Sequence, residues 1–281
     1  MLEPQKHHFW LIIIFFLNNA QKMNENKNYE NILVFDTETN GLNFCNDDLL
    51  SIGWVKVRKY DNDTIEYVER AEYFVLNDDV KNKTETLKIN KIEDEFRNEY
   101  GKPIEEILRR FKESVKGCDV YAFNVRFDVG FVEKYDEEVF KEAKSVGEIQ
   151  IHPGESVINS LQRIIYDYYG SFNHWIYISD HLHSAFDDSV AELIILFHDV
   201  YGMSVEDYFI SVDEFEPVVG SGQYKNILVS EMVKNRNYLK WFMYEKQSEY
   251  EDYLRDYISQ RMDVSDYVAK KGNLFYKALK E

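Results

Sequence analysis

Two acidic residues stand one residue apart at the end of an apolar run, in the stretch 34–42 that reads VFDTETNGL. Side chains two positions apart in a β-strand point to the same face, so Asp36 and Glu38 are predicted to lie side by side. Neighbouring carboxylates repel each other unless a cation binds between them or one of them is protonated. Oxygen ligands of this kind suit Mg²⁺ or Mn²⁺. The pattern is also common at solvated strand ends, so by itself it does not identify a metal site.

Two later stretches place polar residues where a new helix is predicted to begin. In the stretch 121–128 (YAFNVRFD), a strand is predicted to deliver Asn124 and a helix to begin near Asp128. In the stretch 183–193 (HSAFDDSVAEL), a histidine precedes Asp188 by five residues at the start of an apolar helix. Histidine is the natural general base near neutral pH. Each stretch alone also has a structural explanation, because acids and caps are common in a first helical turn.

The three stretches taken in order resemble the DEDDh 3′–5′ exonucleases, the family of polymerase proofreading subunits and related DNA and RNA exonucleases. The shared pattern is Asp-x-Glu on a strand, Asn-x-x-x-Asp entering a helix and His-x-Ala-x-x-Asp entering a later helix. The resemblance covers about residues 31–202, and all five diagnostic positions are filled. It implies an α/β, RNase H-like fold, in which helices flank a mixed five-stranded sheet and Asp36 lies on the central strand.

The resemblance also implies a role for each diagnostic residue. Two divalent ions, Mg²⁺ or Mn²⁺, would be held by four carboxylates: Asp36, Glu38, Asp128 and Asp188. His183 would be the general base that activates water, since His181 lacks the five-residue spacing to Asp188. Two ions about 4 Å apart provide an attacking hydroxide, a clamp on the phosphate and help for the departing 3′ oxygen. Five residues are expected to contact the substrate: Thr37, Thr39, Asn124, Phe127 and Lys225.

The chain departs from the family pattern at two places. Many relatives carry a histidine directly before the asparagine of the second stretch, where this chain has Phe123. That phenylalanine is interpreted as a buried strand residue, with stacking on a base as the alternative. Many relatives also carry a His-Gly-Ile-type element near the terminal nucleotide, and the nearest match here is residues 89–92 (INKI). Substrate preference therefore does not follow from the resemblance.

Hydrophobic periodicity predicts the elements that must position these residues. Strands followed by alternating helices and strands favour a mixed sheet with helices packed on it. Strands are expected at 31–36, 50–57, 65–76 and 119–123, and helices at 104–115, 127–143, 156–169 and 187–201. We divide the chain into an N-terminal extension (1–29), an exonuclease domain (30–204), a linker (205–221) and a small, mainly helical C-terminal module (222–281).

The C-terminal module bears a second, weaker resemblance, to a module that follows the exonuclease domain in exodeoxyribonuclease X-like proteins. The matching segments are 222–226 (GQYKN), 229–232 (VSEM) and 238–242 (YLKWF). The module is expected to help bind nucleic acid, with Tyr224 or Trp241 available for stacking on bases. The alternative is that Tyr238 and Trp241 form its core, and for Trp241 we favour this core position. The basic residues expected near phosphates are Lys225, Lys234, Arg236 and Lys240.

The composition limits the classes of function. A length of 281 residues with 44% hydrophobic residues suits one mid-sized domain plus a smaller one and argues against general disorder. The formal net charge of −18 argues against binding of nucleic acid through bulk charge. We therefore expect weak, salt-sensitive binding at strand ends, dependent on metal ions and local basic patches. Cys45 and Cys118 are interpreted as free thiols in a reducing compartment.

The N-terminus contains nine consecutive apolar residues at 9–17 (FWLIIIFFL). This run is too short to span a bilayer, which requires about 20 residues. Its length fits the core of a signal peptide, but we favour an upstream extension with Met23 as an alternative start. We therefore expect an intracellular protein, cytoplasmic or nuclear, and a secretory or membrane location is the alternative.

These patterns together predict a two-metal 3′–5′ exonuclease. It would release nucleoside 5′-monophosphates from the 3′ ends of single-stranded or frayed DNA, and the C-terminal module favours DNA over RNA. One alternative is a 3′–5′ exoribonuclease of the oligoribonuclease or RNase T kind. A second is a non-catalytic nucleic-acid-binding subunit on the same fold. The expected partners are single-stranded 3′ ends and a polymerase or a replication and repair complex.

Overall fold

A five-stranded mixed sheet forms the centre of the protein, in the strand order β3-β2-β1-β4-β5. The structure is a computed structural model that describes residues 28–77, 79–140, 142–169, 174–176, 182–204, 209–211, 217, 219, 222–225, 227–244 and 252–261. The central strand β1 (Tyr29–Thr39) pairs antiparallel with β2 (Leu49–Tyr60) and parallel with β4 (Asp119–Ala122). The outer strands are β3 (Ile65–Phe74) and β5 (Lys144–Ser145). This is the α/β architecture that the sequence predicted.

The central position of β1 follows from its apolar residues. Ile32 and Val34 pack into one buried cluster, whereas Leu33 and Phe35 pack into another on the opposite face of the sheet. All four side chains are fully buried. A strand needs apolar residues on both sides only if both faces of the sheet are covered.

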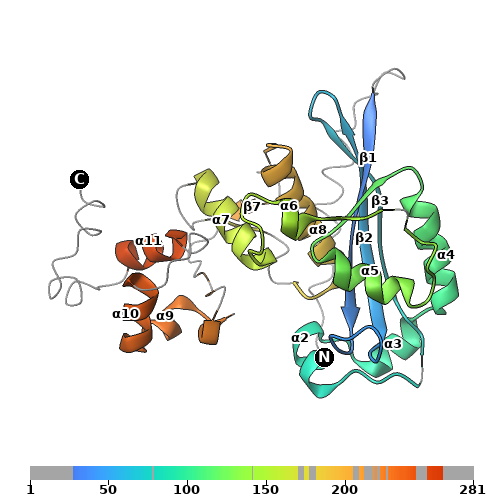
Figure 1. Ribbon diagram of the computed structural model, residues 1–281, viewed down its shortest axis with the longest axis horizontal. Helices are drawn as coiled ribbons and strands as arrows, with labels where there is room; N and C mark the ends of the chain where they lie inside the picture. The colour runs from blue at the N-terminus through green and yellow to red at the C-terminus, as the bar shows by residue number, and fades with distance from the viewer. Residues whose placement is uncertain are drawn as a thin grey trace, which may run out of the picture.

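Helices supply that cover on each face. On the Ile32 face lie α7 (Val157–Tyr169) and α8 (Ala185–Ile195), and on the opposite face lie α4 (Ile104–Val115) and α5 (Val125–Glu133). Figure 1 shows α4 and α7 on opposite sides of the strands. Both faces of β1 are therefore excluded from water, and the strand can hold its terminal residues rigidly.

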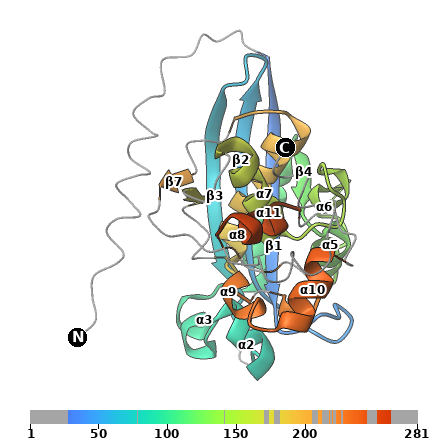
Figure 2. The same ribbon diagram turned by 90° about the vertical axis from the view of Figure 1, so that its left-hand side faces the viewer.

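Two short helices pack near the carboxyl end of β1, and Figures 1 and 2 show them side by side below the sheet. They are α2 (Thr84–Asn90) and α3 (Asp94–Tyr100). The fully buried Arg97 of α3 donates hydrogen bonds to the backbone oxygens of Val75 (2.8 Å) and Asn77 (3.1 Å). These carbonyl oxygens and the Asp94 carboxylate, at 3.3 Å, stabilise the buried cation, so α3 is fastened to the segment that follows β3.

Most predicted elements are confirmed. The helix at 104–115 has the expected bounds, and that at 156–169 begins one residue later. The last helix of the domain is α8, which continues as a π-helix (Leu196–Val200) and stops before Gly202, where φ is 64°.

The predicted helix at 127–143 is wrong in its second half, because α5 ends at Glu133. The backbone N–H groups of Tyr135 and Asp136 both donate to the carbonyl of Val132, and the chain then turns. Val139 lies in this turn but is buried in the same cluster as α5. Its burial explains the apolar spacing that resembled a longer helix. The very short α6 (Val146–Ile149) follows β5.

The C-terminal module is mainly helical and has its own apolar cluster. It comprises a 3₁₀ turn (Gly222–Tyr224), α9 (Val229–Met232), α10 (Arg236–Tyr244) and α11 (Asp252–Arg261). Tyr166 of α7 packs against this cluster. The predicted core position of Trp241 is wrong, since its side chain is 38% exposed and touches Tyr238 with ring centroids 5.1 Å apart.

Residues 209–211, within the predicted linker, form β7 (Phe209–Ser211), which pairs antiparallel with β6 (His174–Ile176). Most of the remaining linker, the apolar run at 9–17 and His181 lie outside the described residues. In the part of the chain that the structure describes, no helix has the length and apolar character needed to cross a membrane.

Gly53 of β2 allows α8 to approach the sheet closely. A Cβ at this position would overlap backbone atoms of Ala185 and Phe186 at the start of α8. We predict that Gly53→Ala lowers the free energy of unfolding by about 1–3 kcal/mol, because overpacking at a tight contact costs this much. Urea denaturation measures the change. The control is Gly117→Ala, whose added Cβ meets no atom within 4 Å and which carries only the cost of a positive φ, about 1 kcal/mol. Equal losses in the two variants would contradict the close contact.

Candidate active site

The carboxyl end of β1 presents two acids toward α8. Asp36 and Glu38 continue the alternation of Ile32 and Val34, so they share the face that α8 covers. Both acids are half-buried, and surrounding atoms remove much of their hydration although each keeps some contact with solvent. The predicted side-by-side arrangement of these two carboxylates therefore holds in the structure.

The second stretch contributes Asp128 from the opposite side of β1. β4 ends at Ala122, and α5 begins after Asn124, whose carbonyl accepts hydrogen bonds from the N–H groups of Phe127 and Asp128. The carboxylate of Asp128 is 2% exposed and accepts a hydrogen bond of 2.7 Å from the hydroxyl of Thr37. Thr37 points to the α5 face of β1, so it connects the two stretches and fixes the Asp128 side chain.

The third stretch begins α8. Ser184 is the N-cap, and its hydroxyl accepts a hydrogen bond from the N–H of Asp187. His183 has a φ of 79°, which is uncommon for a residue with a side chain. Its backbone N–H donates to the carboxylate of Asp188 at 2.9 Å. The strained turn and this hydrogen bond together set the position of the imidazole relative to Asp188.

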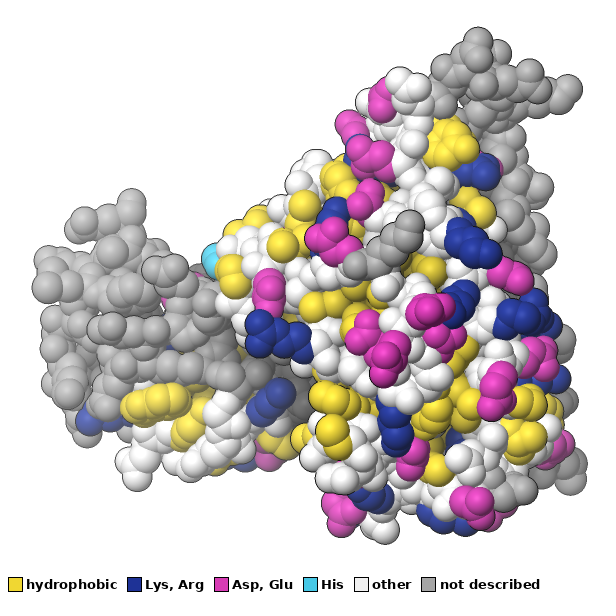
Figure 3. All heavy atoms as spheres, turned by 45° about the vertical axis from the view of Figure 1, so that its right-hand side comes forward, with side chains coloured by type: hydrophobic (Ala, Val, Ile, Leu, Met, Phe, Trp, Pro, Cys, Tyr) yellow, Lys and Arg dark blue, Asp and Glu magenta, His cyan; other side chains and the backbone are white. Residues whose placement is uncertain are grey.

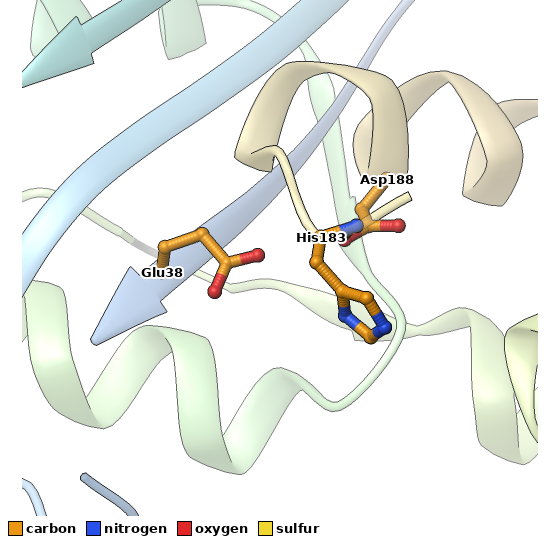
Figure 4. Close-up of side chains that lie close together, drawn as sticks. All are labelled: Glu38, His183 and Asp188. Carbon is orange, nitrogen blue, oxygen red and sulfur yellow. Dashed lines mark hydrogen bonds between the residues drawn. The ribbon is translucent and has the colours of Figure 1, made fainter. Parts of the chain in front are cut away.

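The first and third stretches meet at the end of β1. Glu38, His183 and Asp188 each offer one ligand atom, and these atoms all lie within 4.8 Å of one another. In Figure 4 the carboxylate of Glu38 points from β1 toward His183 and Asp188 at the start of α8. Residues that are about 150 positions apart in the sequence thus form a single cluster that could hold a cation.

The surroundings of the four acids disfavour their charged forms. Burial, followed by repulsion from neighbouring carboxylates, raises the pKa of Asp36 well above its ordinary value and that of Glu38 to about 9. Burial also raises the pKa of Asp128 and that of Asp188 to about 7. Within the described residues, no Lys or Arg forms an ion pair with any of these four acids. Proximity and burial therefore favour either bound protons or bound cations.

A fifth acid belongs to the cluster and was missed by the sequence analysis. Glu192 lies one helical turn after Asp188, is 1% exposed and accepts a hydrogen bond of 3.1 Å from the backbone N–H of Phe123. Burial and the charges of Asp128 and Asp188 raise its pKa well above the ordinary value. The signal was present, because a glutamate four residues after Asp188 in an apolar helix must share its face.

The imidazole of His183 has an environment suited to a base. The side chain remains exposed, but nearby atoms displace part of its hydration, and this effect and the charge of Lys91 lower its pKa below 6.5. A lowered pKa keeps the ring neutral, and able to accept a proton, at neutral pH.

The residues 89–92 approach the acids as well. The Asn90 side chain donates to the carbonyl of Thr39 at 3.2 Å, and its hydrogen bond to the carboxylate of Glu38 lowers the pKa of that group, against the larger effect of burial. Lys91 caps α2 with a φ of 57°. The segment that lacks the family's histidine and glycine thus still lies beside the acid cluster.

The predicted substrate-contact residues lie in three different settings. Thr37 and Thr39 are buried, and their hydroxyls bond to Asp128 and to the carbonyl of Gly41. Asn124 is exposed at the start of α5, whereas Phe127 packs on Phe131 with ring centroids 4.9 Å apart. Lys225 is exposed in the C-terminal module and is not part of the acid cluster. Their contacts with substrate stay predictions.

Phe123 is half-buried against the cluster that contains Val190, so it packs on the core as predicted, but it directly follows β4 and is not a strand residue. Its carbonyl accepts hydrogen bonds from the N–H of Gly147 at 3.1 Å and from the hydroxyl of Ser145 at 2.8 Å. The backbone of this residue therefore connects β4, the turn before α6 and Glu192.

Comparison with known families identifies the domain that carries this cluster. The RNase_T model, described as an exonuclease, matches residues 33–196, which is more than half of the chain. The chain belongs to this exonuclease family. It carries a 3′–5′ exonuclease domain of the DEDD type, and the matched span begins within β1 and ends at the start of the π-helix.

A curated relative also matches part of the chain. The protein is 36% identical over 100 residues to a DNA polymerase III PolC-type from Caldanaerobacter subterraneus subsp. tengcongensis. The match covers 36% of this chain and 7% of the polymerase. The likeness thus concerns one segment of a much longer protein.

Solved structures with a similar arrangement include several of Exonuclease I. An Exonuclease I from Methylocaldum szegediense is 17% identical, with a TM-score of 0.40 over 60% of this chain and 40% of the other. Another, described as suggesting how processivity is achieved, is 14% identical, with a TM-score of 0.42 over 62% and 42%. The chain thus spans less than half of these proteins. Members of the family use divalent metal ions, and one related structure is the zinc-bound form of an E. coli Exonuclease I complex with single-stranded DNA.

The raised pKa values predict an unusual pH dependence of stability for the metal-free protein. An acid whose pKa is higher in the folded than in the unfolded state binds more protons when folded. The free energy of unfolding should therefore fall as the pH rises from about 5 to 9, through the folded pKa values of about 7 for Asp128 and about 9 for Glu38. Differential scanning calorimetry in EDTA measures this; a rising free energy of unfolding over that range would contradict it.

Removal of one acid should lessen the loss of stability at high pH. We expect Glu38→Gln to raise the Tm of the metal-free protein at pH 8 by several degrees, equivalent to roughly 1 kcal/mol or more, and to weaken the stabilisation that Mn²⁺ gives to the wild type. Asp61→Asn, in the exposed turn after β2, is the matched control and should change neither quantity.

Proposed function

We propose that the protein is a divalent-metal-dependent 3′–5′ exonuclease that hydrolyses phosphodiester bonds at the 3′ end of single-stranded or frayed DNA and releases nucleoside 5′-monophosphates. The observation that carries this proposal is the convergence of ligand atoms of Glu38, His183 and Asp188 within 4.8 Å, beside the half-buried Asp36 and the buried Asp128. An imidazole next to clustered carboxylates provides both a base and cation ligands, which phosphodiester hydrolysis requires.

The acid cluster fits divalent cations. Its groups are buried oxygen ligands with raised pKa values and no Lys or Arg ion pair among the described residues. Hard cations such as Mg²⁺ or Mn²⁺ prefer such ligands. We propose two ions held by Asp36, Glu38, Asp128 and Asp188. When bound, the ions would polarise the scissile phosphate and stabilise charge on the departing 3′ oxygen.

The residues of the chain have distinct tasks in this reaction. His183 accepts the proton of the attacking water, and its exposed ring lets water and substrate reach it. Asp188 accepts the His183 backbone N–H and so keeps the base at the cluster. Thr37 holds Asp128 in place through its hydroxyl. The exposed Asn124 amide and the half-buried Phe127 ring, at the start of α5, would contact the terminal nucleotide.

The choice of DNA rests on two supports. The relative that is 36% identical over 100 residues is a DNA polymerase III PolC-type, and this also suggests association with a polymerase or a replication and repair complex. The C-terminal module presents exposed Lys225 and Trp241, which suit phosphates and bases of a single strand. On the face in Figure 3, acidic and basic side chains are interspersed, and with a net charge of −18 we expect local contacts to hold the strand.

A nuclease assay tests the proposal. Purified full-length protein is incubated with 5′-labelled single-stranded DNA or RNA in Mn²⁺, in Mg²⁺ and in EDTA. We expect 3′ shortening of DNA that EDTA abolishes. His183→Ala should lower kcat by about 10²–10⁴-fold, the range for loss of a general base, while His152→Ala, a control near the start of α7, should retain activity.

The assay also separates the alternatives. Shortening of RNA but not of DNA would replace the proposal with an exoribonuclease. Intact label on both substrates, in the presence of an active reference exonuclease, would contradict catalysis and favour a non-catalytic binding role.

The C-terminal module can be tested separately. Stacking on an aromatic residue contributes about 1–3 kcal/mol per base, so Trp241→Ala should raise KM for single-stranded DNA by about 5–100-fold with little change in kcat. Lys225→Ala should also raise KM and reduce its salt dependence. Ile227→Ala, which removes another exposed apolar side chain of the module, is the control. An unchanged KM in both Trp241 and Lys225 variants would exclude the module from substrate binding.

A further inference from the structure

Glu72 of β3 lies on the same side of the sheet as the acid cluster but belongs to none of the three motif stretches. In the register of the sheet, Gly53 of β2 is paired with Asp36 on one side and with Glu72 on the other. Asp36, Gly53 and Glu72 thus lie side by side across three strands. Because Gly53 has no side chain, there is space between the two acids, and the start of α8 occupies it.

The carboxylate of Glu72 contacts the first turn of α8. Both of its oxygens accept from the Ser184 hydroxyl, at 3.3 Å each. The backbone N–H groups of Ala185 and Phe186 interact with the same carboxylate. Three consecutive residues directly after His183 therefore converge on one side chain of a neighbouring strand. A carboxylate at the N-terminus of a helix is also favoured by the helix dipole.

The stability of the fold does not by itself explain why an acidic residue, Glu72, lies beside the first turn of α8. Burial, and then repulsion from Asp187, raise the pKa of Glu72 to about 7, so the charged form is unfavourable here. Ser184 already caps α8 by accepting the N–H of Asp187. What Glu72 adds is a connection between β3 and the turn that carries the base.

Leu182 and Phe186 on either side of that turn pack against the apolar cluster of this face, and Glu72 adds a directional polar contact to the turn. His183 is in the left-handed region with a φ of 79°, a conformation that persists only where surrounding contacts impose it. The Asp188 carboxylate accepts the His183 N–H within the same turn, but this bond moves with the turn and does not fix it to the sheet. The contacts of Glu72 and the close approach at Gly53 do so from outside.

We propose that Glu72 is a positioning residue, which anchors the first turn of α8 on the sheet and thereby holds His183 and Asp188 opposite Glu38. This inference rests on the proposed function, because it assigns His183 and Asp188 to catalysis and cation binding. In this role Glu72 would act through the turn and would not itself contact substrate or ion. A misplacement of about 1 Å in a catalytic group can cost about 100-fold in rate, so the anchor has a measurable effect on turnover.

The experiment compares two substitutions of Glu72 with a matched substitution on the same strand. Glu69 also lies on β3 and accepts hydrogen bonds, from the Trp54 indole at 3.1 Å and the Ser114 hydroxyl at 2.8 Å. Ser114 belongs to α4, so Glu69 serves the opposite face of the sheet. For the wild type and the variants Glu72→Ala, Glu72→Gln and Glu69→Ala, we would measure kcat and KM on single-stranded DNA, the Mn²⁺ concentration for half-maximal activity, Mn²⁺ binding by electron paramagnetic resonance, and Tm.

Glu72→Ala is expected to lower kcat by about 10–100-fold and to weaken Mn²⁺ binding, with KM nearly unchanged. Glu72→Gln keeps an oxygen acceptor for Ser184 and should restore kcat to within about 5-fold of wild type, since a retained hydrogen bond preserves the geometry. Glu69→Ala should lower Tm but leave kcat and Mn²⁺ binding as in the wild type.

The inference is overturned if Glu72→Ala matches the wild type in kcat and Mn²⁺ binding, or if it changes no more than Glu69→Ala at equal loss of Tm. Failure to rescue by Glu72→Gln would also overturn an anchoring role. A wild type that neither cleaves DNA nor binds Mn²⁺ would instead refute the proposed function, and the inference with it. If Glu72→Ala does not fold, the comparison of Glu72→Gln with Glu72→Asp decides, because the shorter carboxylate cannot reach Ser184 and should lose activity.

Discussion

Repulsion among acids at the end of β1 is the constraint on which the rest of the structure depends. Asp36, Glu38, Asp128, Asp188 and Glu192 are gathered from three elements into a space where burial raises the pKa of each. Without a cation, charge in this cluster opposes folding, so the scaffold must supply the free energy that holds the acids together. The apolar clusters on both faces of the sheet provide it, and their largest members include Trp54, Phe35 and Phe111. The apolar core therefore lies directly behind the site, where repulsion among the acids costs the most free energy.

A small number of hydrogen bonds orient the acids. Thr37 donates to Asp128, the backbone of His183 donates to Asp188, and the backbone of Phe123 donates to Glu192. Each donor lowers the pKa of the acid that it contacts, but in each case burial has the larger effect. Hydrogen bonds thus orient the carboxylates without neutralising them. Because the carboxylates are oriented but their charge is not compensated, the arrangement favours cation binding.

The sequence predicted those parts of the site that follow from local pattern. The Asp36–Glu38 pair, the start of a helix near Asp128 and the helix after His183 come from strand alternation and helix signals, and the structure contains all three. Contacts between elements could not be predicted in this way. Glu72 contacts α8 where Gly53 leaves room between them, and the pattern at 127–143 resembled one long helix because Val139 is buried from a turn. Glu192 could be predicted only in part. Its spacing from Asp188 is visible in the sequence, but its burial is not.

The acidic net charge of −18 and a site that depends on cations are consistent with each other. At physiological ionic strength, charges are screened over about 8 Å, so most surface acids act on a nucleic-acid strand only when it is close. In the proposed function, neutralisation by bound cations would be local to the end of β1, and the basic residues of the C-terminal module would act at a second place. A strand would then gain attraction at two points, against the general repulsion from an acidic protein. This distribution of charge is consistent with the proposed preference for strand ends.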